Sequence, residues 1–373
     1  MAICSGFGNT HRAAFRSSNT SPRRCGTRSS VSWLSALRTI WSTSKNDNAG
    51  EIVKVLVTGA SGFVGIHLVR EIAARGLNAV ACTFEQPSEE ALARIEGVEA
   101  RVTWAELDVR NKSLVETVLR ERDVDAILHA AAVTSAPSAV NAMAEVNVEG
   151  TRHMLEAAVR HSVRRFVFLS SGAVYGDVDA SAGRIGEDHP LKGDNPYARF
   201  KMAAEALSRD YAGGHDLSVS IARLGTLYGP VEGRSPYRQK PSIPWRLVEL
   251  TLEKRSVRVF GLATKRPYSF VDDAARALVD LALMRPEGGD TFHVGSEESV
   301  AFSRLLDIVG RLRPEVRFEP VDSIAEADLS MKPEDARPVL DGARLESVLG
   351  PVAWRSVEAG LEQLMDWSAG LER

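Results

Sequence analysis

Two residues in the middle of the chain have the spacing and the chemistry of a proton-transfer pair. Tyr197 and Lys201 lie in residues 195–201, Asn-Pro-Tyr-Ala-Arg-Phe-Lys, and on a helix a spacing of four places both side chains on one face. A free tyrosine has a pKa of about 10 and is a poor base at pH 7. One ammonium at roughly 4 Å favours the phenolate by about 4 kcal/mol, or roughly three pKa units. Such a pair can take a proton from a sugar or alcohol hydroxyl and return it.

The bare spacing has a second interpretation, a half-buried helix tyrosine beside a solvated lysine. The segments before the pair decide between the two. Residues 52–57 form an apolar run broken only by Lys54, which predicts a buried parallel strand. A glycine loop, residues 58–65, follows directly, and residues 66–75 have helical periodicity closed by Gly76.

The order strand, glycine loop, helix predicts a dinucleotide site. Gly59 allows the tight turn, Gly62 lets the backbone approach a pyrophosphate, and Gly65 lets the helix pack closely on the strand. The helix N terminus then faces the phosphates. The predicted cofactor-binding residues of this loop are Gly59, Ser61, Gly62, Phe63, Val64 and Gly65.

The next predicted strand, residues 79–83, leaves the choice between NAD and NADP open. An acid at the end of this strand commonly holds the ribose 2′-hydroxyl of NAD. Thr83 stands there, with Glu85 two residues on and no adjacent arginine. Neither the acid typical of NAD nor the arginine typical of NADP is present, so we expect NAD without excluding NADP.

Further strands alternate with helices through residue 169. We expect strands at 101–107, 125–129 and 166–169, and a helix that begins at Asn147. The small residues Ala130 and Ala131, after the strand at 125–129, would let a flat ligand lie on the backbone, or would simply pack at a strand end. The alternation predicts an α/β fold with a parallel, doubly wound sheet of the Rossmann type.

The following segments complete a pattern that spans most of the chain. Residues 169–176 read Leu-Ser-Ser-Gly-Ala-Val-Tyr-Gly, and residues 266–273 read Arg-Pro-Tyr-Ser-Phe-Val-Asp-Asp. With these, the chain resembles the extended short-chain dehydrogenase/reductase superfamily, in its NAD-dependent epimerase/dehydratase branch. The other matching pieces are residues 58–65, Asp108-Val109, His129-Ala130-Ala131, Asn147 with Gly150-Thr151, Tyr197 with Lys201, and residues 223–230.

The resemblance implies roles for these positions. Tyr197 would be the general base and acid, Lys201 would bind the nicotinamide ribose and lower the pKa of Tyr197, and Ser171 would hydrogen-bond the reacting oxygen. A turn-capping hydroxyl is the alternative interpretation of Ser171. The implied contacts to the cofactor beyond the glycine loop are Asp108 and Val109 at the adenine, then Ala130, Ala131, Asn147, Tyr197 and Lys201.

A smaller C-terminal α/β substrate domain is expected by the same resemblance. We expect residues 51–230 to form the cofactor domain and residues 231–373 mainly the substrate domain, with some segments returning to the first. A proline-rich basic loop, with Arg234, Tyr237 and Arg238, precedes Arg266. Together they suit a phosphate or carboxylate on the substrate. A solvated loop without a specific role is the alternative.

The chain departs from the family pattern at the substrate side. Thr226 stands where many nucleotide-sugar enzymes have asparagine, yet we predict that it contacts substrate along with Ser171 and Arg266. Residues 325–338 contain no clear second phosphate-binding arginine, and Lys332 and Arg337 are loose candidates. A Thr-Asp-Glu segment, which sugar 4,6-dehydratases use for elimination, is absent between Ser171 and Tyr175, which disfavours a dehydratase.

Composition limits the partners. The net charge is −3, with 44% hydrophobic and 25% charged residues, as in ordinary globular proteins, and no nucleic-acid partner is expected. The three cysteines, Cys4, Cys25 and Cys82, lack metal-ligand spacing, so we expect no metal and a reducing compartment. No run approaches 18 apolar residues, so no membrane association is expected.

Residues 1–50 have a net charge of +6 and are rich in serine and arginine. That composition is typical of an organellar transit peptide, but also fits a disordered extension or a start site assigned too far upstream. We therefore expect a cytoplasmic protein, with an organellar location as the alternative.

Three functions remain open. The first is an NAD(P)-dependent sugar or nucleotide-sugar epimerase with Tyr197 as acid/base. The second is an NAD(P)-dependent dehydrogenase or reductase of a small sugar acid or carbonyl compound, which would consume cofactor. The third is an inactive nucleotide-binding scaffold, which the intact Ser171, Tyr197 and Lys201 disfavour. The resemblance also implies a homodimer.

Overall fold

The computed structural model describes residues 53–134, 140–179, 182–212, 214–233, 240–253, 255–284 and 289–371. By its internal contacts the chain divides into Met1–Gly50 and Glu51–Arg373, and the described residues all belong to the second unit. The predicted extension at residues 1–50 and the loop residues Arg234, Tyr237 and Arg238 lie outside the described residues.

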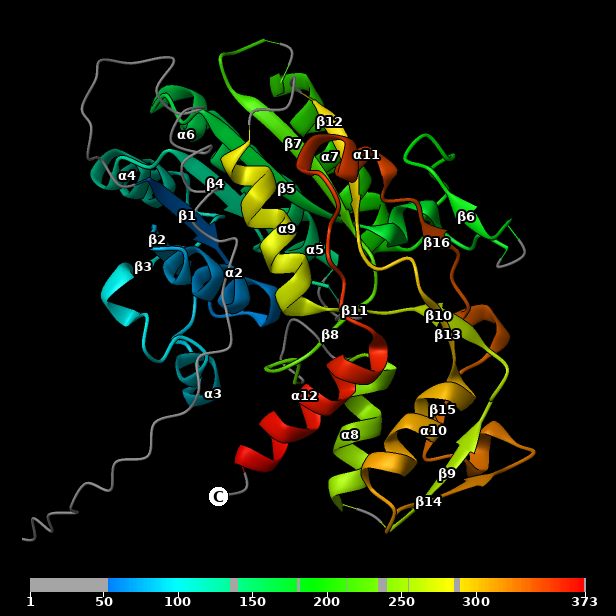
Figure 1. Cartoon of the computed structure of the whole chain (residues 1–373). Helices are drawn as coiled ribbons and strands as arrows, with labels where there is room; N and C mark the ends of the chain where they lie inside the picture. The colour runs from blue at the N-terminus through cyan, green and yellow to red at the C-terminus, as the bar shows by residue number, and fades with distance from the viewer. Residues whose placement is uncertain are drawn as a thin grey trace, which may run out of the picture. The chain divides into compact units, whose positions relative to one another are not determined.

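A seven-stranded sheet forms the centre of the described unit (Figure 1). Its strands are β1 Lys54–Thr58, β2 Asn78–Thr83, β3 Val102–Glu106, β4 Ala126–His129, β5 Arg165–Ser171, β7 Ser218–Leu224 and β12 Asp290–Val294. All neighbours pair in parallel, in the order β3-β2-β1-β4-β5-β7-β12. The Rossmann-type doubly wound sheet is therefore confirmed. The strand order reverses between β1 and β4, where such sheets bind their ligands.

Helices cover both faces of this sheet (Figure 1). One face carries α4 Lys112–Arg122, α6 Gly150–Arg160 and α7 Pro196–Ala212, whose apolar residues join the core with β1, β4 and β5. The other carries α2 Phe63–Ala74 and α9 Val271–Leu283, which pack on each other. The strands are apolar on both sides because both sides are buried: in β1, the residues after Lys54 are at most 1% exposed.

The helix predicted to begin at Asn147 begins earlier. Helix α5 spans Val140–Ala144, a π-helical turn spans Glu145–Glu149, and α6 then continues. The prediction failed because the apolar periodicity is offset by this wider turn, and π turns often occur at functional sites. Asn147 lies within it and is 1% exposed.

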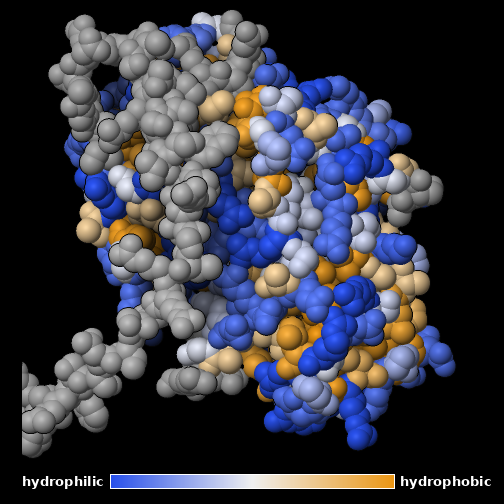
Figure 2. Space-filling view, viewed as in Figure 1, coloured by the Kyte–Doolittle hydropathy of each residue, from blue (hydrophilic) through white to orange (hydrophobic). Residues whose placement is uncertain are grey.

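A second apolar core lies beside the sheet. It is formed by a three-stranded parallel sheet, β9 Ser256–Phe260 between β14 Arg317–Pro320 and β15 Leu329–Ser330, with helices α8 Ile243–Glu253, α10 Phe302–Leu312 and α12 Val357–Leu371. In the space-filling view, hydrophobic residues come to the surface in the lower part, around α10 and α12 (Figure 2).

Short elements connect the two cores. The remaining strands and helices are β6 Arg184–Ile185, β8 Leu227–Tyr228, β10 Lys265–Pro267, β11 Ser269–Phe270, β13 Ser299–Ala301, β16 Val339–Leu340, α3 Glu89–Ala93 and α11 Ala343–Leu349. They pair as β10 with β13, β11 with β8 and β16 with β6. Although β12 and α9 follow residue 231, they belong to the central sheet and its helical layer. The domain boundary at residue 230 stays a prediction.

Candidate active site

Tyr197 and Lys201 lie on the first turns of α7. Asn195 caps this helix, because its Oδ1 accepts a hydrogen bond from the Ala198 amide at 2.9 Å. Pro196 takes the first helical position, where its missing N–H costs nothing. The local sequence thus fixes where the helix starts, and with it the face that Tyr197 and Lys201 share.

The Lys201 ammonium is buried behind the tyrosine. Its side chain is 3% exposed, and Nζ lies 5.9 Å from the centre of the Tyr197 ring. Nζ donates to the Leu169 carbonyl oxygen at 2.7 Å and lies 4.7 Å from the centre of the Phe168 ring. Burial lowers the pKa of Lys201 to about 8, although the Glu205 carboxylate acts to raise it. Two of the three ammonium protons are left for other acceptors.

Ser171 ends β5, opposite Leu224 at the end of β7. Its Oγ accepts a hydrogen bond from the Ala173 amide at 3.2 Å. The hydroxyl therefore caps the following turn, and its own proton remains available for a reacting oxygen. Capping and a catalytic contact, the two interpretations of Ser171, are compatible.

The glycine loop has the tight packing expected of a dinucleotide site. Gly59 has φ +63°, and a Cβ on it would lie 2.9 Å from the Ala131 Cα atom. A Cβ on Gly65 would lie 2.0 Å from the Gly59 carbonyl oxygen. Only glycine therefore fits at either position. Ala131, which was predicted to line the cofactor channel, is brought directly against the loop.

The N terminus of α2 fits a dinucleotide phosphate. Gly62 is its N-cap, no side chain in the described part of the chain caps the helix, and its first turn contains no acidic residue. The first amide groups of a helix have no partner within the helix and carry partial positive charge. The residues present thus suit the pyrophosphate of NAD.

At the adenosine end, the predicted residues are already engaged with neighbours. Arg110 donates to both oxygens of Asp108, from Nη2 at 2.7 Å and Nε at 3.0 Å, and this hydrogen bonding lowers the pKa of Asp108. Thr83 donates to the Glu85 carbonyl oxygen and shares a hydrogen bond with Ser61 Oγ. A carboxylate can still accept from an adenine amino group, because it has about four acceptor positions.

A buried chain of hydrogen bonds joins β1, β4 and the π turn. The Thr151 hydroxyl donates to the Asn147 carbonyl oxygen, so it accepts from His129 Nε2 at 3.0 Å. His129 Nδ1 is then the acceptor, and Thr58 Oγ1 donates to it at 2.8 Å. Burial, with the nearby Lys201 charge, lowers the pKa of His129 to about 3, which agrees with a neutral ring.

The Asn147 side chain holds the loop that follows β4. Its Oδ1 accepts from the Val133 amide and its Nδ2 donates to the Val133 carbonyl oxygen, both at 2.9 Å. Gly150 packs closely on Val109, because a Cβ on it would lie 2.5 Å from Val109 Cγ2. Asn147 thus positions the backbone at Val133, and its predicted contact with the cofactor stays a prediction.

At the substrate side, two predicted residues contact each other. Arg266 Nε donates to Thr226 Oγ1 at 2.9 Å. Burial lowers the pKa of Arg266, and the nearby Arg337 charge acts in the same direction. Among the described residues its Nη groups have no hydrogen-bond partner. Arg337 lies close enough to act on this charge, and Lys332 lies just beyond the end of the β15 strand.

Behind α7 lies a buried ionic network that the sequence did not reveal. Glu205, one turn after Lys201 and fully buried, accepts from Ser170 Oγ at 2.6 Å and from Arg223 Nη2 at 2.7 Å. Arg223 Nη1 in turn donates to the Tyr175 hydroxyl at 2.7 Å. The one available signal was the continuation of the Tyr197–Lys201 face by Glu205, at the same spacing of four.

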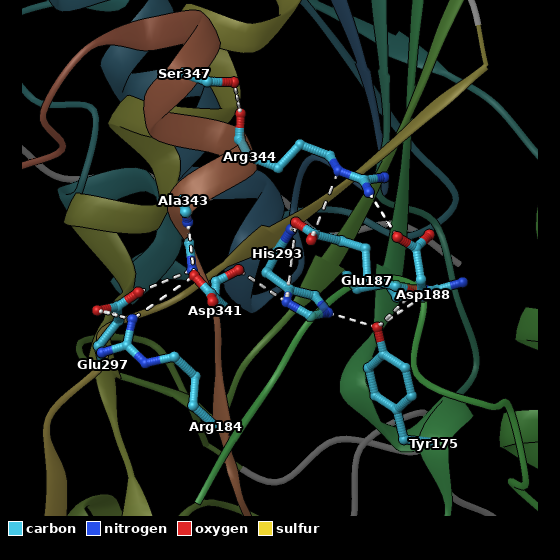
Figure 3. Close-up of polar contacts among 12 residues, drawn as sticks. Tyr175, Arg184, Glu187, Asp188, His293, Glu297, Asp341, Ala343, Arg344 and Ser347 are labelled. Carbon is cyan, nitrogen blue, oxygen red and sulfur yellow. Dashed lines mark hydrogen bonds and ion pairs between the residues drawn. The ribbon is translucent and has the colours of Figure 1, made fainter.

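The network continues to His293 in β12. Figure 3 shows the Tyr175 hydroxyl pointing at the His293 ring, and the distance to Nε2 is 2.5 Å. His293 Nδ1 donates to the Asp341 carbonyl oxygen at 3.0 Å, so in the neutral ring Nε2 accepts from the Tyr175 hydroxyl, which itself accepts from Arg223. Burial lowers the pKa of His293. Figure 3 also shows Arg344 of α11 reaching toward Glu187 and Asp188 from the other side.

A small cavity of about 100 Å³ adjoins this network, with His293, Glu297 and Trp354 among its lining residues. Within the described ranges, no group of three or more histidine, cysteine, aspartate and glutamate residues is placed to hold a metal ion. No helix in the described part of the chain is both long and apolar enough to cross a membrane.

Comparison with known proteins agrees with this geometry. The sequence profile of the NAD dependent epimerase/dehydratase family matches residues 55–295. The chain therefore belongs to this family, whose members are NAD-dependent enzymes of the extended short-chain dehydrogenase/reductase type, as the sequence resemblance indicated.

The chain is similar to both main classes of the family. It is 28% identical over 332 residues to a dTDP-glucose 4,6-dehydratase of Streptomyces antibioticus, covering 84% of this chain and 92% of that protein. It is 28% identical to the UDP-glucose 4-epimerase of Thermus thermophilus in complex with NAD, with a TM-score of 0.69 and coverage of 85% and 99%. It is also 28% identical to MoeE5 in complex with UDP-glucose and NAD, with a TM-score of 0.67 and coverage of 86% and 100%.

Proposed function

We propose that this protein is a nucleotide-sugar epimerase that inverts a carbinol carbon by transient oxidation. The observation that carries the proposal is the buried Lys201 ammonium beneath Tyr197. The same ammonium donates to the Leu169 carbonyl oxygen in β5, the strand that ends at Ser171. The bound NAD supplies the hydride acceptor and, on return, the hydride donor. The chain's own residues supply the proton transfer and the binding of the sugar nucleotide.

Tyr197 removes the proton from the sugar hydroxyl as that carbon is oxidised, and gives it back when the carbon is reduced on the other face. The Lys201 charge favours the phenolate that takes the proton. Ser171 donates its free proton to the reacting oxygen, which holds the hydroxyl and then the ketone in place. No further proton donor is needed, because Tyr197 returns the proton that it took.

Arg266 supports a nucleoside diphosphate as the anchor of the substrate. Its guanidinium is held through Nε by Thr226, so its Nη edge remains for an acceptor. A planar guanidinium binds phosphate oxygens in pairs. Arg337, one of the two loose candidates from the sequence, has its charge close to that of Arg266 and provides the second cation.

Elimination of water, the dehydratase reaction, is not supported. Elimination needs further acid and base groups beside the tyrosine, and the positions after Ser171 are Gly172, Ala173 and Val174. A Cβ at Gly172 would already lie 3.3 Å from Leu340 Cδ1 and 3.4 Å from the Leu224 carbonyl oxygen. A side chain at this position would therefore require Leu340 to shift by a few tenths of an ångström.

The test is product analysis by proton NMR. The protein is incubated with UDP-glucose, UDP-glucuronic acid and dTDP-glucose in separate reactions with NAD⁺. The proposal predicts a mixture of two sugar epimers from at least one nucleotide sugar, without a 4-keto-6-deoxy sugar. A 4-keto-6-deoxy product, or turnover only of sugars without a nucleotide, would contradict it.

A further inference from the structure

A buried histidine joins helix α2 to the segment after β8, where the predicted substrate domain begins. His67 lies on α2, one turn after Phe63, and its side chain is 0% exposed. Its Nδ1 lies 2.5 Å from Asp272 Oδ1, and its Nε2 lies 3.0 Å from the Pro230 carbonyl oxygen. Arg94 Nη2 also lies 3.4 Å from Nδ1, but the Asp272 oxygen is much closer. Because the nearest partner of each ring nitrogen is an acceptor, both nitrogens donate, which is the hydrogen bonding of an imidazolium.

Asp272 is the counter-ion of a three-residue cluster. Arg94, which follows α3, donates from Nη2 to both oxygens of Asp272, at 2.9 and 3.1 Å. Burial acts to raise the pKa of Asp272, but the hydrogen bond and charge of His67, together with Arg94, hold it well below its usual range. The carboxylate therefore stays charged and accepts from His67 and Arg94 together.

The backbone that His67 holds is strained. Val231, directly after Pro230, has φ +65°, a conformation that a β-branched residue rarely adopts. Gly229, on the other side, leaves no room for a side chain, because a Cβ would lie 2.6 Å from Val271 Cγ1 at the start of α9. Such strain persists only where the surroundings hold the backbone in place.

A second anchor lies just beyond the strained residue. Glu232 is fully buried and accepts hydrogen bonds from the amide and the hydroxyl of Ser242, at 2.6 and 2.7 Å. The short segment of residues 229–233 is therefore fixed on one side by His67 and on the other by Ser242. Of these two anchors, only His67 belongs to the helix that receives the dinucleotide.

Phe63 provides the link to that ligand. It opens α2, and its ring meets the His67 ring edge to face with the centroids 6.0 Å apart. A pyrophosphate at the helix N terminus would fix the first turn of α2, and with it the Phe63 ring that meets His67 one turn later.

We propose that His67 is a positioning residue, which as an imidazolium holds the strained Pro230–Val231 backbone and couples filling of the dinucleotide site to the order of this segment. Residues 229–233 connect the cofactor domain to the substrate side, so cofactor binding would prepare the region that the sugar nucleotide meets next. The inference depends on a dinucleotide binding at α2 and not on epimerisation.

The test is hydrogen–deuterium exchange of the whole protein with and without saturating NAD⁺. In the unaltered chain, NAD⁺ should slow exchange of the amides of residues 231–233 by about fivefold or more, the lower end of usual coupling energies. In His67→Leu this response should be lost, while the glycine-loop amides still slow on addition of NAD⁺. An unchanged NAD⁺ response of residues 231–233 in His67→Leu, or none in the unaltered chain, would overturn the proposal.

The matched control is His161→Leu. It removes another imidazole–carboxylate contact, 2.9 Å between His161 Nε2 and Glu116 Oε2, which touches neither α2 nor Pro230. This variant should exchange like the unaltered chain. If His67→Leu does not fold, His67→Gln carries the same test, because a carboxamide cannot donate to Asp272 and Pro230 in the manner of an imidazolium. At least half of the NAD⁺ response should then disappear, and a full response would equally overturn the proposal.

Discussion

The Lys201 ammonium lies 5.9 Å from the centre of the Tyr197 ring, one turn away on the same helix. The ammonium is buried, and a charge in a poorly screened position acts more strongly on its neighbours than one in water. The same burial lowers the pKa of Lys201 itself to about 8. The geometry thus favours the tyrosinate and also sets an upper pH limit on that effect.

Replacing Tyr197 by phenylalanine should remove the proton transfer and leave binding nearly intact. We expect kcat to fall by about 10²- to 10⁴-fold, the range for loss of a general acid/base, with little change in KM. Steady-state kinetics and NAD⁺ titration check this. Tyr211→Phe, on the same helix, is the control and should keep its activity. Near-normal turnover of Tyr197→Phe would refute the role.

The pH profile should have an alkaline limit set by Lys201. Below about pH 8 the ammonium is protonated and favours the tyrosinate, and above it the charge is lost, so kcat should decline as the pH rises through 8. In Lys201→Arg the guanidinium stays charged. Whatever the maximal rate of that variant, its alkaline decline should disappear.

The control for this profile is Lys112→Arg, a change in a surface lysine that pairs with Glu156. Its alkaline limb should match that of the unaltered chain. A Lys201→Arg profile with the original alkaline limb would show that another group sets it.

Arg266 should affect substrate binding more than turnover. Arg266→Gln removes a charged donor, worth about 1.5–3 kcal/mol, so KM for the nucleotide sugar should rise about 10- to 100-fold with a smaller effect on kcat. Arg337→Gln should act in the same direction. Lys265→Gln, a change in the exposed neighbour of Arg266, is the control. An unchanged KM in Arg266→Gln would exclude a phosphate contact.

Glu205 should be a stability residue rather than a catalytic one. Glu205→Gln leaves the buried Arg223 guanidinium without its counter-ion, and breaking a buried pair costs about 3–5 kcal/mol. The midpoint of urea unfolding should shift accordingly. Glu358→Gln, which breaks the exposed pairs with Arg304 and Arg311, should change it little. Equal midpoints for the two variants would contradict the assignment.

The cofactor half of the fold could be predicted because its signals are local. The strand before Gly59, the glycines themselves and the alternation of strands and helices each follow from neighbouring residues. The helix at Asn147 was placed too late, since a π turn changes the period without a sequence mark of its own.

The contacts that join distant segments could not be predicted. Arg337 is 71 positions from Arg266 in the sequence, and no pattern links them. The His67–Asp272 contact likewise joins residues 205 positions apart. The His67–Asp272 contact depends on how α2 and α9 pack, and one sequence contains no record of that packing. The bonds that engage the Thr83 hydroxyl with Ser61 and Glu85 also had no sequence signal.

The most direct test of the central claim follows the cofactor and the sugar in one reaction. The purified protein is mixed with a nucleotide sugar that it turns over, the absorbance of reduced nicotinamide is recorded, and the nucleotide released on denaturation is identified by mass. Transient oxidation predicts that the epimer accumulates over many turnovers while the total NADH never exceeds the amount of protein. NADH or NADPH that rises or falls in step with product would contradict an epimerase, and would establish a dehydrogenase or reductase instead.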